Sequence, residues 1–464
     1  MASRAFLLRS STVAALGGLL FGFDAAVISG TVDDLVVQFD LSSAQEGFTV
    51  ACALIGTIVG AAAIGKPSDV FGRRAMMFVL ALLFLVSAIG CALAWDWTSL
   101  LVFRAIGGLG IGGASVVAPM YIAEIAPSQM RGRLVALAQF NIVLGLLLAY
   151  VSNYIVAQFE LGEAQWRWMF GVEAAPALLY FGLLFLTPRS PRWLVAKGRT
   201  DEARAVLTRL GTDDNDAVKA ELASIEHSLK RERNNLKERF FQAAHSAPIM
   251  LAIAIAMFNQ LSGINAVLYY APSIFKSAGF EENAALLNSA GIGLVNLIVT
   301  MVAITMIDWA GRKRLMIVGL IGYIVSLAAI AWAFYTQGFK NDLGEQAFST
   351  LGAWTVFAGL VAFIAAHAFG QGAVIWVFLS EIFPTQVRAR GQALGCFTHW
   401  VMAAIISQTF PMIAESSGGH VFTFYALMMV LQLVWVLRVM PETRGVPLEE
   451  LGRRIESTSP TEHA

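Results

Sequence analysis

Long apolar runs separated by short polar segments dominate the chain. Each run is about 20 residues long, the length an α-helix needs to cross the hydrocarbon core of a bilayer. The expected spans cover residues 8–32, 46–66, 75–95, 97–122, 134–158, 168–187, 246–275, 284–307, 314–336, 350–380, 391–415 and 420–440. The pattern therefore predicts an all-α membrane protein with twelve transmembrane helices.

The composition agrees with a membrane protein and argues against other classes. Hydrophobic residues make up 57% of the chain and charged residues 14%, whereas a soluble domain carries about 25% charged residues. The formal net charge of zero gives no support to nucleic-acid binding. Cys52, Cys91 and Cys396 lie inside apolar runs without metal-ligand spacing, so we expect small core residues and neither a disulfide, a metal site nor a cofactor.

The distribution of basic residues predicts the orientation of the chain. With an inner N-terminus, 28 of the 32 Lys and Arg residues fall on the cytoplasmic side, so both termini are expected there. Arg4 and Arg9 precede the first apolar run as in a secretory signal. Because eleven further spans follow, we expect no cleaved signal peptide and a multi-pass protein of the plasma membrane, in a bacterium the inner membrane.

The chain repeats itself at a distance of about half its length. "DVFGRR" (69–74) recurs as "DWAGRK" (308–313), and "IAEIAPSQMRGR" (122–133) recurs as "LSEIFPTQVRAR" (379–390) with six of twelve residues identical. Two six-helix halves related by an axis along the membrane normal are a known transporter plan. We predict an N-terminal half at 1–190, a cytoplasmic helical linker at 191–243 and a C-terminal half at 244–464. The linker histidines His227 and His245 are expected to be solvated.

Eight motifs in order resemble the sugar porter family of the major facilitator superfamily. They are "GFDAAVISG", "DVFGRR", "RAIGGLGIGGASVVAPMYIAEIAPSQMRGR", "PRSPRWL", "NQLSGINAVLYYAP", "DWAGRK", "GAVIWVFLSEIFPTQVRARG" and "PETRG". The resemblance implies the major facilitator fold. It also implies transport of monosaccharides or polyols, by proton symport in some members and by uniport in others.

Asp24 and Arg104 are expected to be the only two clearly intramembrane charges. Each lies about 10–12 Å from the outer end of its predicted helix, at a rise of 1.5 Å per residue. A paired buried charge costs far less than an unpaired one, so we expect the two to face each other. A purely structural ion pair is one interpretation. The other is a proton switch, which the resemblance favours, because proton-coupled members carry this Asp and Arg and uniporters generally lack the Asp.

Polar side chains gather in the seventh span, where a sugar would need hydrogen-bonding partners. Gln260 and Asn265 would point about 140° apart on an intact helix, but Ser262 and Gly263 permit a break. Amides that join helices are the alternative. The candidate substrate residues, several of them implied by the resemblance, are Phe21, Asn259, Gln260, Asn265, Tyr269, Asn296, Trp376, His399 and Trp400.

The chain departs from the family pattern at several positions. Asn259 and Leu146 stand where relatives often have glutamine, and His399 stands where they often have glutamine or asparagine, so glucose specificity is not assumed. His399 is either a satisfied interior histidine or a group that binds substrate or makes uptake sensitive to pH. Arg189 stands where the family usually has a glutamate, which would loosen the inner gate.

Acidic and basic residues at the inner ends of the spans suggest a cytoplasmic gate. Ordinary topology signals explain the basic residues but not the matched acids. Several coupled ion pairs would bias an equilibrium between outward-open and inward-open states. The candidate gating residues are Asp69, Arg73, Arg74, Glu124, Arg131, Asp308, Arg312, Lys313, Glu381 and Arg388.

The sequence predicts proton-coupled uptake of a hexose, pentose or polyol by alternating access. A facilitative uniporter of the same fold is the alternative, and a transporter-like nutrient sensor is disfavoured because only ten residues follow Arg454. No P-loop, catalytic triad or metal cluster appears in the polar segments, so we expect no enzyme. The expected partners are the sugar or polyol, a proton and the lipid bilayer, with no nucleic acid, and the protein is expected to be monomeric.

Overall fold

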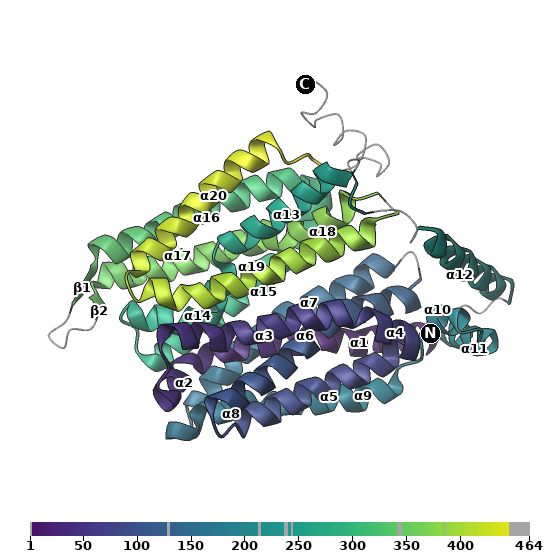
Figure 1. Ribbon diagram of the computed structural model, residues 1–464, viewed down its shortest axis with the longest axis horizontal. Helices are drawn as coiled ribbons and strands as arrows, with labels where there is room; N and C mark the ends of the chain where they lie inside the picture. The colour runs from purple at the N-terminus through teal and green to yellow at the C-terminus, as the bar shows by residue number, and fades with distance from the viewer. Residues whose placement is uncertain are drawn as a thin grey trace. The chain divides into compact units, whose positions relative to one another are not determined.

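The computed structural model describes residues 2–127, 130–211, 215–235, 240–242, 245–340, 346–384 and 386–444. Parts of the predicted linker and the tail after Arg444 lie outside these ranges. The chain divides into two compact units (Figure 1). The N-terminal unit holds residues 1–34 and 52–234, and the C-terminal unit holds residues 35–51 and 235–464.

Twelve helical segments among the described residues are long and apolar enough to cross a membrane, which confirms the twelve predicted spans. They are Ala5–Gly30, Ser43–Ala63, Arg73–Ala92, Trp97–Ile125, Arg131–Ala157, Gly162–Leu186, Ser246–Ser277, Glu282–Ala310, Arg312–Thr336, Thr350–Glu381, Arg388–Ala414 and Gly418–Arg438.

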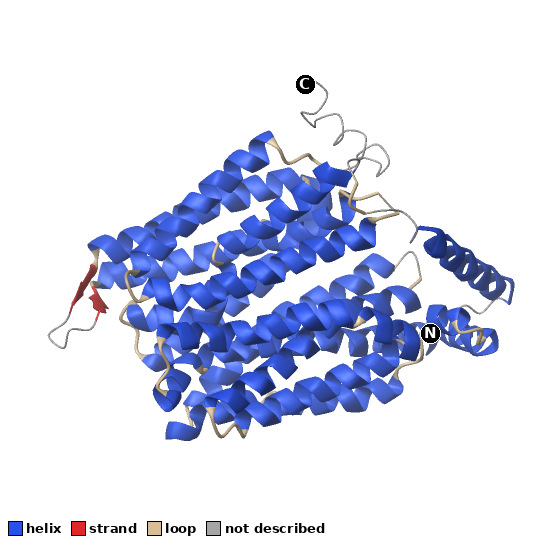
Figure 2. Ribbon diagram, in the orientation of Figure 1, coloured by secondary structure: helices blue, strands red, loops and turns tan. Residues whose placement is uncertain are grey.

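The N-terminal unit is helical throughout its described part (Figure 2). Its elements are α1 (Ala2–Val27), η1 (Ile28–Gly30), α4 (Gly65–Phe71), α5 (Arg73–Ala92), α6 (Trp97–Ile125), α7 (Arg131–Ala157), η2 (Gly162–Ala164), α8 (Gln165–Gly171), α9 (Ala174–Leu183), η3 (Leu184–Leu186), α10 (Pro191–Ala196), α11 (Thr200–Leu210) and α12 (Asn215–Asn235). Residues of α2 (Val32–Phe39) and α3 (Ser43–Ala63) belong to both units.

The C-terminal unit adds eight helices and a two-stranded hairpin in its described part. Its elements are α13 (Ser246–Leu261), α14 (Ile264–Ser277), α15 (Glu282–Ala310), α16 (Arg312–Thr336), β1 (Gly338–Lys340), β2 (Gln346–Phe348), α17 (Thr350–Phe369), α18 (Gln371–Glu381), α19 (Arg388–Ala414) and α20 (Gly418–Arg438). The antiparallel strands pair Gly338 with Phe348. The apolar pattern did not predict them, because three-residue strands leave too short an alternation to recognise.

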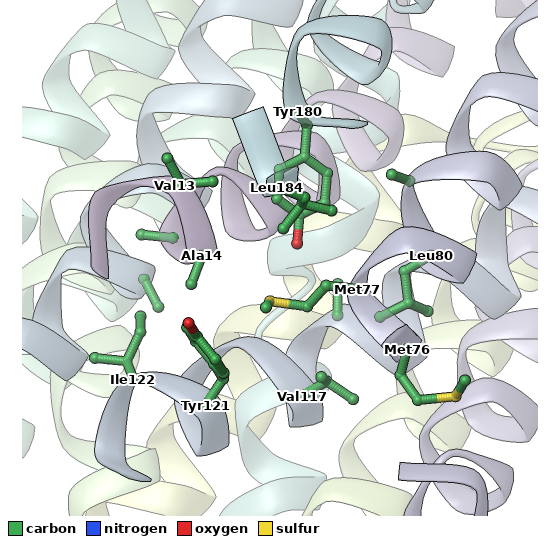
Figure 3. Packing of buried hydrophobic residues seen from close by; sticks show 14 of the residues in the cluster. Val13, Ala14, Met76, Met77, Leu80, Val117, Tyr121, Ile122, Tyr180 and Leu184 are labelled. Carbon is green, nitrogen blue, oxygen red and sulfur yellow. The ribbon is translucent and has the colours of Figure 1, made fainter. Parts of the chain in front are cut away.

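The core of the N-terminal unit lies between α1, α5, α6 and α9 (Figure 3). Val13 and Ala14 of α1, Leu80 of α5 and Tyr180 of α9 are all buried there. The hydroxyl of Tyr121 donates to the carbonyl of Pro188 at 2.7 Å. A buried hydroxyl needs such a partner, and this bond fixes the end of the sixth span against α6.

A capping box begins α6, the helix that carries Arg104. The backbone N–H of Ser99 donates to Oδ1 of Asp96 at 2.7 Å, and the Asp96 N–H donates to Oγ of Ser99 at 3.1 Å. The guanidinium of Arg167 donates to the carbonyls of Ala92 and Ala94 in the same loop. These bonds satisfy backbone groups at the helix ends and fix where α6 starts.

The seventh span is broken where Ser262 and Gly263 permitted a break. Gly263 separates α13 from α14 with a φ of 83°, a left-handed conformation that favours glycine. An added Cβ would also lie 2.3 Å from the ring of Tyr425 on α20. The break therefore requires glycine for two reasons: the left-handed backbone conformation and the close approach of the Tyr425 ring.

The described part of residues 191–243 contains the helices α10, α11 and α12. Leu194 of α10, Leu207 of α11 and Leu222 of α12 share a small apolar core. Residues 212–214, 236–239, 243 and 244 lie outside the described ranges. His227 is exposed as expected, but the expectation for His245 is wrong. His245 is buried and its Nδ1 lies 3.0 Å from the carbonyl of Phe240, because the chain has already entered the C-terminal unit there.

Candidate functional site

Asp24 on α1 and Arg104 on α6 form a buried ion pair. Nη1 of Arg104 lies 2.7 Å from Oδ1 of Asp24 and 3.3 Å from the Asp24 carbonyl oxygen. The two side chains are 1% and 2% exposed, so water screens neither charge. Each partner offsets much of the cost of burying the other, which explains why an aspartate persists in an apolar helix. The sequence placed the two at equal depth, and the structure joins them.

A third buried ionisable group interacts with this pair, and the sequence analysis did not identify it. Glu173, between α8 and α9, is 1% exposed and interacts electrostatically with both Asp24 and Arg104. It stands five residues into the run at 168–187, where an acid near a span end is easily assigned to the interface. Its position inside the run was the signal that could have revealed it.

The three charged groups are incompletely satisfied. Within the described residues, Oδ2 of Asp24, Nε of Arg104 and Oε1 of Glu173 are buried without a hydrogen-bond partner. Glu173 also interacts electrostatically with both members of the Asp24–Arg104 pair, and two carboxylates near each other in a buried site oppose each other's ionisation. A proton on one carboxyl would balance the charge, so the arrangement has the chemistry of a proton-binding site.

The second candidate site lies around the break in the seventh span. Nε2 of Gln260 on α13 donates to Oδ1 of Asn259 at 3.1 Å and lies 3.2 and 3.3 Å from the two ring nitrogens of His399, one of which can accept its second hydrogen. Oε1 of Gln260 and Nδ2 of Asn265 are buried with no partner among the residues described. Buried polar atoms normally have partners, so these two atoms near one helix break are candidates for hydrogen bonds to a polar ligand.

Aromatic rings complete this cluster. The ring centroid of His399 on α19 lies 5.0 Å from that of Trp376 on α18 and 4.9 Å from that of Trp400. Trp376 is 37% exposed, whereas His399 and Trp400 are buried. The sequence predicted these three residues and Gln260 for one site, and all four belong to the C-terminal unit.

The remaining predicted substrate residues lie at different places. Tyr269 of α14 is buried, and Asn296 of α15 accepts a hydrogen bond from Thr300 at 3.4 Å. Phe21 belongs to the N-terminal unit, where it packs against the buried core. Leu146, the apolar replacement noted in the sequence, is buried in α7.

A buried histidine that the sequence analysis missed lies near His399. His367, in the last turn of α17, bonds through Nδ1 to the hydroxyl of Tyr323 on α16 and interacts electrostatically with His399. A histidine inside the apolar run at 350–380 was the available signal. The C-terminal unit therefore has two imidazoles near the amide cluster.

The predicted gating charges of the N-terminal unit meet at Arg73. Its Nη1 lies 2.9 Å from Oδ1 of Asp69, and its Nε lies 2.9 Å from Oε1 of Glu124. Arg74 and Arg131 bond differently. Arg74 donates to the carbonyls of Leu184 and Phe185, and Arg131 donates to the Ala126 carbonyl at 3.5 Å.

The C-terminal unit repeats this arrangement around Arg312. Its Nη2 lies 3.1 Å from Oδ1 of Asp308 and 2.8 Å from Oε1 of Glu381. Lys313 donates through Nζ to the Leu437 carbonyl, and Arg388 donates through Nε to the Phe383 carbonyl.

The "PETRG" motif joins this network through residues that the sequence analysis left without a role. Glu442 accepts the backbone N–H groups of Arg312 and Lys313 at 3.0 Å each, so its carboxylate caps the start of α16. The Thr443 hydroxyl donates to Glu381. Arg189, in the N-terminal unit, lies 3.6 Å from Glu202 in an exposed pair.

Comparison with known proteins gives a consistent answer. Residues 10–454 match the family described as "Sugar (and other) transporter". A D-xylose transporter of Levilactobacillus brevis is 39% identical over 94% of this chain and 93% of its own. An arabinose-proton symporter of Bacillus subtilis (strain 168) is 36% identical over 97% of this chain and 95% of its own.

Solved structures agree with the sequence relatives. The xylose transporter of E. coli in an inward open conformation has a TM-score of 0.83 and 35% identity, covering 96% of this chain and 98% of that one. The proton:xylose symporter of the major facilitator superfamily bound to 6-bromo-6-deoxy-D-glucose has a TM-score of 0.77 at 35% identity, covering 97% and 99%. The chain therefore belongs to the sugar transporter family and has the major facilitator fold that its motifs predicted.

Proposed function

We propose that this protein takes up a monosaccharide together with a proton, as a secondary active transporter of the bacterial inner membrane. One observation carries the proposal: a fully buried aspartate whose carboxylate pairs with Arg104 through only one of its two oxygens. A purely structural ion pair would be more stable with hydrogen bonds to both carboxylate oxygens. The names of an arabinose-proton symporter and a D-xylose-proton symporter among the relatives support the same activity.

In this proposal Asp24 carries the proton. Neutralising Asp24 removes most of its attraction to Arg104, so α1 and α6 are freer to move relative to each other inside the N-terminal unit. A switch of this kind needs a two-state element that the proton biases. Alternating access of two six-helix halves, at 1–190 and 244–464, would supply the two states.

The substrate in this proposal is a pentose or hexose held mainly by the C-terminal unit. Gln260 and Asn265 offer an acceptor and a donor to sugar hydroxyls, and the ring of Trp376 suits the C–H face of a pyranose. His399 stands where the family pattern often has glutamine or asparagine, and it brings an imidazole to this site. The relatives' names point first to xylose and arabinose, with glucose as a further candidate.

The charge networks around Arg73 and Arg312 are proposed to brace the cytoplasmic ends of the helices. Each network ties the helix ends of one unit together, so it makes that unit move as a rigid body. Arg74, Arg131, Lys313 and Arg388 each donate to a backbone carbonyl and support the same helix ends. The proposal also places both termini in the cytoplasm. It further treats the protein as a monomer without enzymatic activity.

Two measurements test this function. Thermal-shift screening of the purified protein against D-xylose, L-arabinose, D-glucose and polyols identifies the substrate by the ligand's stabilisation of the folded state. Proteoliposomes with an acidic exterior then report uptake of that sugar. Accumulation above the external concentration that a protonophore abolishes is expected. Equilibration without accumulation would instead favour a uniporter.

A further inference from the structure

An oxygen of Asp24 and the hydroxyl of Ser87 both pack closely against Gly107, and we call the interval between these two oxygens the gap. On Gly107 of α6, an added Cβ would lie 2.3 Å from Oδ2 of Asp24 and 2.4 Å from Oγ of Ser87 on α5. Real Cβ contacts essentially never come so close, so only glycine fits here. Oδ2 and the Ser87 hydroxyl therefore both lie close to the point that a side chain at position 107 would occupy, and so they lie near each other.

The two oxygens of Asp24 have different surroundings. Oδ1 accepts from Arg104 at 2.7 Å, whereas Oδ2 is buried and has no hydrogen-bond partner among the described residues. Ser87 is 2% exposed, so water does not solvate this gap freely. A buried acceptor left without a partner costs about 1–3 kcal/mol. We therefore expect another state of the protein in which Oδ2 makes a hydrogen bond.

We propose that this gap is the proton site, with Oδ2 of Asp24 as the atom that binds the proton and Ser87 as the residue that accepts the resulting hydrogen bond. Gly107 is the positioning residue, because a side chain there would displace Oδ2 or the Ser87 hydroxyl. The proposal rests on the proposed function, because it assigns atoms to the proton that Asp24 carries.

The proton balance is simple. A proton from the outer side forms an O–H bond with a lone pair of Oδ2, and the carboxylate becomes a neutral acid. Arg104 keeps its charge throughout. The new O–H donates to Oγ of Ser87, while the Ser87 hydroxyl hydrogen remains directed to the Cys91 sulfur, with which Ser87 is hydrogen-bonded. Release toward the cytoplasm breaks the same O–H bond and restores the carboxylate.

The other titratable groups around the gap come from several helices. Arg104 of α6 holds Oδ1, and Glu173 lies near both members of the pair. Cys91 of α5 and Cys52 of α3 also interact electrostatically with Asp24. Glu173 is the competing proton acceptor. The Ser87 contact distinguishes the two, because the gap beside Gly107 adjoins Oδ2 of Asp24.

The test uses Ser87→Ala in proteoliposomes, with D-xylose as the probe if screening identifies it and otherwise the sugar that does bind. Alanine removes the hydroxyl acceptor and leaves α5, Asp24 and Gly107 unchanged. Proton-driven accumulation should then need a more acidic exterior, by about half to one pH unit, the shift that one neutral hydrogen bond produces. Sugar exchange at equal pH should stay within about twofold of wild type, since exchange requires no net proton movement.

Matched controls separate this effect from general damage. Ser115→Ala removes a hydroxyl of α6 that donates to its own helix at Gly112, so its pH profile should equal that of wild type. Gly107→Ala should abolish accumulation while exchange continues. Gly110→Ala, where the nearest atom to the added Cβ is the Phe84 ring at 3.3 Å, should be much milder.

The outcomes are distinct. A wild-type pH profile in Ser87→Ala overturns the inference, whether or not Gly107→Ala folds. If wild type itself fails to accumulate sugar, the proposed function fails first. If wild type accumulates and Asp24→Asn does not, but Ser87→Ala matches wild type, only the assignment of Ser87 is wrong.

Discussion

Arg312 and Glu381 lie 2.8 Å apart in the C-terminal unit, and they repeat the contact between Arg73 and Glu124 in the N-terminal unit. Each of these two arginines also pairs with the aspartate four residues before it in the chain. The sequence repeat is thus a repeat of geometry. Each network joins three helix ends or loops. It therefore stabilises the packing of the whole unit rather than a single pair of surface charges.

We predict that Arg73→Ala and Arg312→Ala destabilise the protein and slow transport without removing sugar binding. Both arginines have nearly buried side chains, at 11% and 8% exposure, so each loss leaves a carboxylate with its partner gone. We expect the free energy of unfolding to fall by about 2–4 kcal/mol, a loss near or slightly below that of breaking a fully buried pair. Thermal unfolding in detergent and uptake by proteoliposomes measure the two effects.

Arg131→Ala is the matched control, because Arg131 donates to the carbonyl of Ala126 at 3.5 Å rather than to an acid. Its melting temperature should lie closer to that of wild type. If all three variants behave alike, the arginines act as topology signals and the networks do not brace the helix ends.

We predict that Gln260→Ala and Asn265→Ala each weaken sugar binding about 5-fold to 150-fold. Each deletion leaves a sugar hydroxyl unpaired in a buried site, at a cost of about 1–3 kcal/mol. Isothermal titration of the purified variants measures the change. Gln337→Ala, which removes an amide that accepts from Ser349 near the hairpin, is the control and should bind as wild type does. Full affinity in both cleft variants would show that the sugar binds elsewhere.

We predict that His399→Gln and His399→Phe differ. Glutamine retains an acceptor for the Gln260 amide, so binding should persist with altered preference among sugars. Phenylalanine removes that acceptor and leaves a buried N–H unpaired, so affinity should fall at least about fivefold. Competition between xylose, arabinose and glucose reports both effects. Equal affinities in the two variants would mean that the imidazole serves packing alone.

The apolar runs predicted the spans well because a bilayer requires helices of nearly fixed length. The Asp24–Arg104 pair was also predictable, since a charge inside a span needs a partner at the same depth. Glu173 was missed because sequence distance from a span end is a poor measure of burial. The Tyr323–His367 bond and the Gly107 gap depend on which helix faces which, and one sequence without an alignment does not fix those neighbours.

The role of Asp24 is tested most directly by comparing wild type with Asp24→Asn in proteoliposomes under an imposed pH gradient. Asparagine keeps the size of the side chain and removes its titration. Arg104 loses its counter-charge, so we expect a stability loss of about 3 kcal/mol, which thermal unfolding in detergent would monitor. We predict that the variant still exchanges sugar across the membrane at equal pH but no longer accumulates it against a gradient. Accumulation by Asp24→Asn equal to that of wild type would contradict the account.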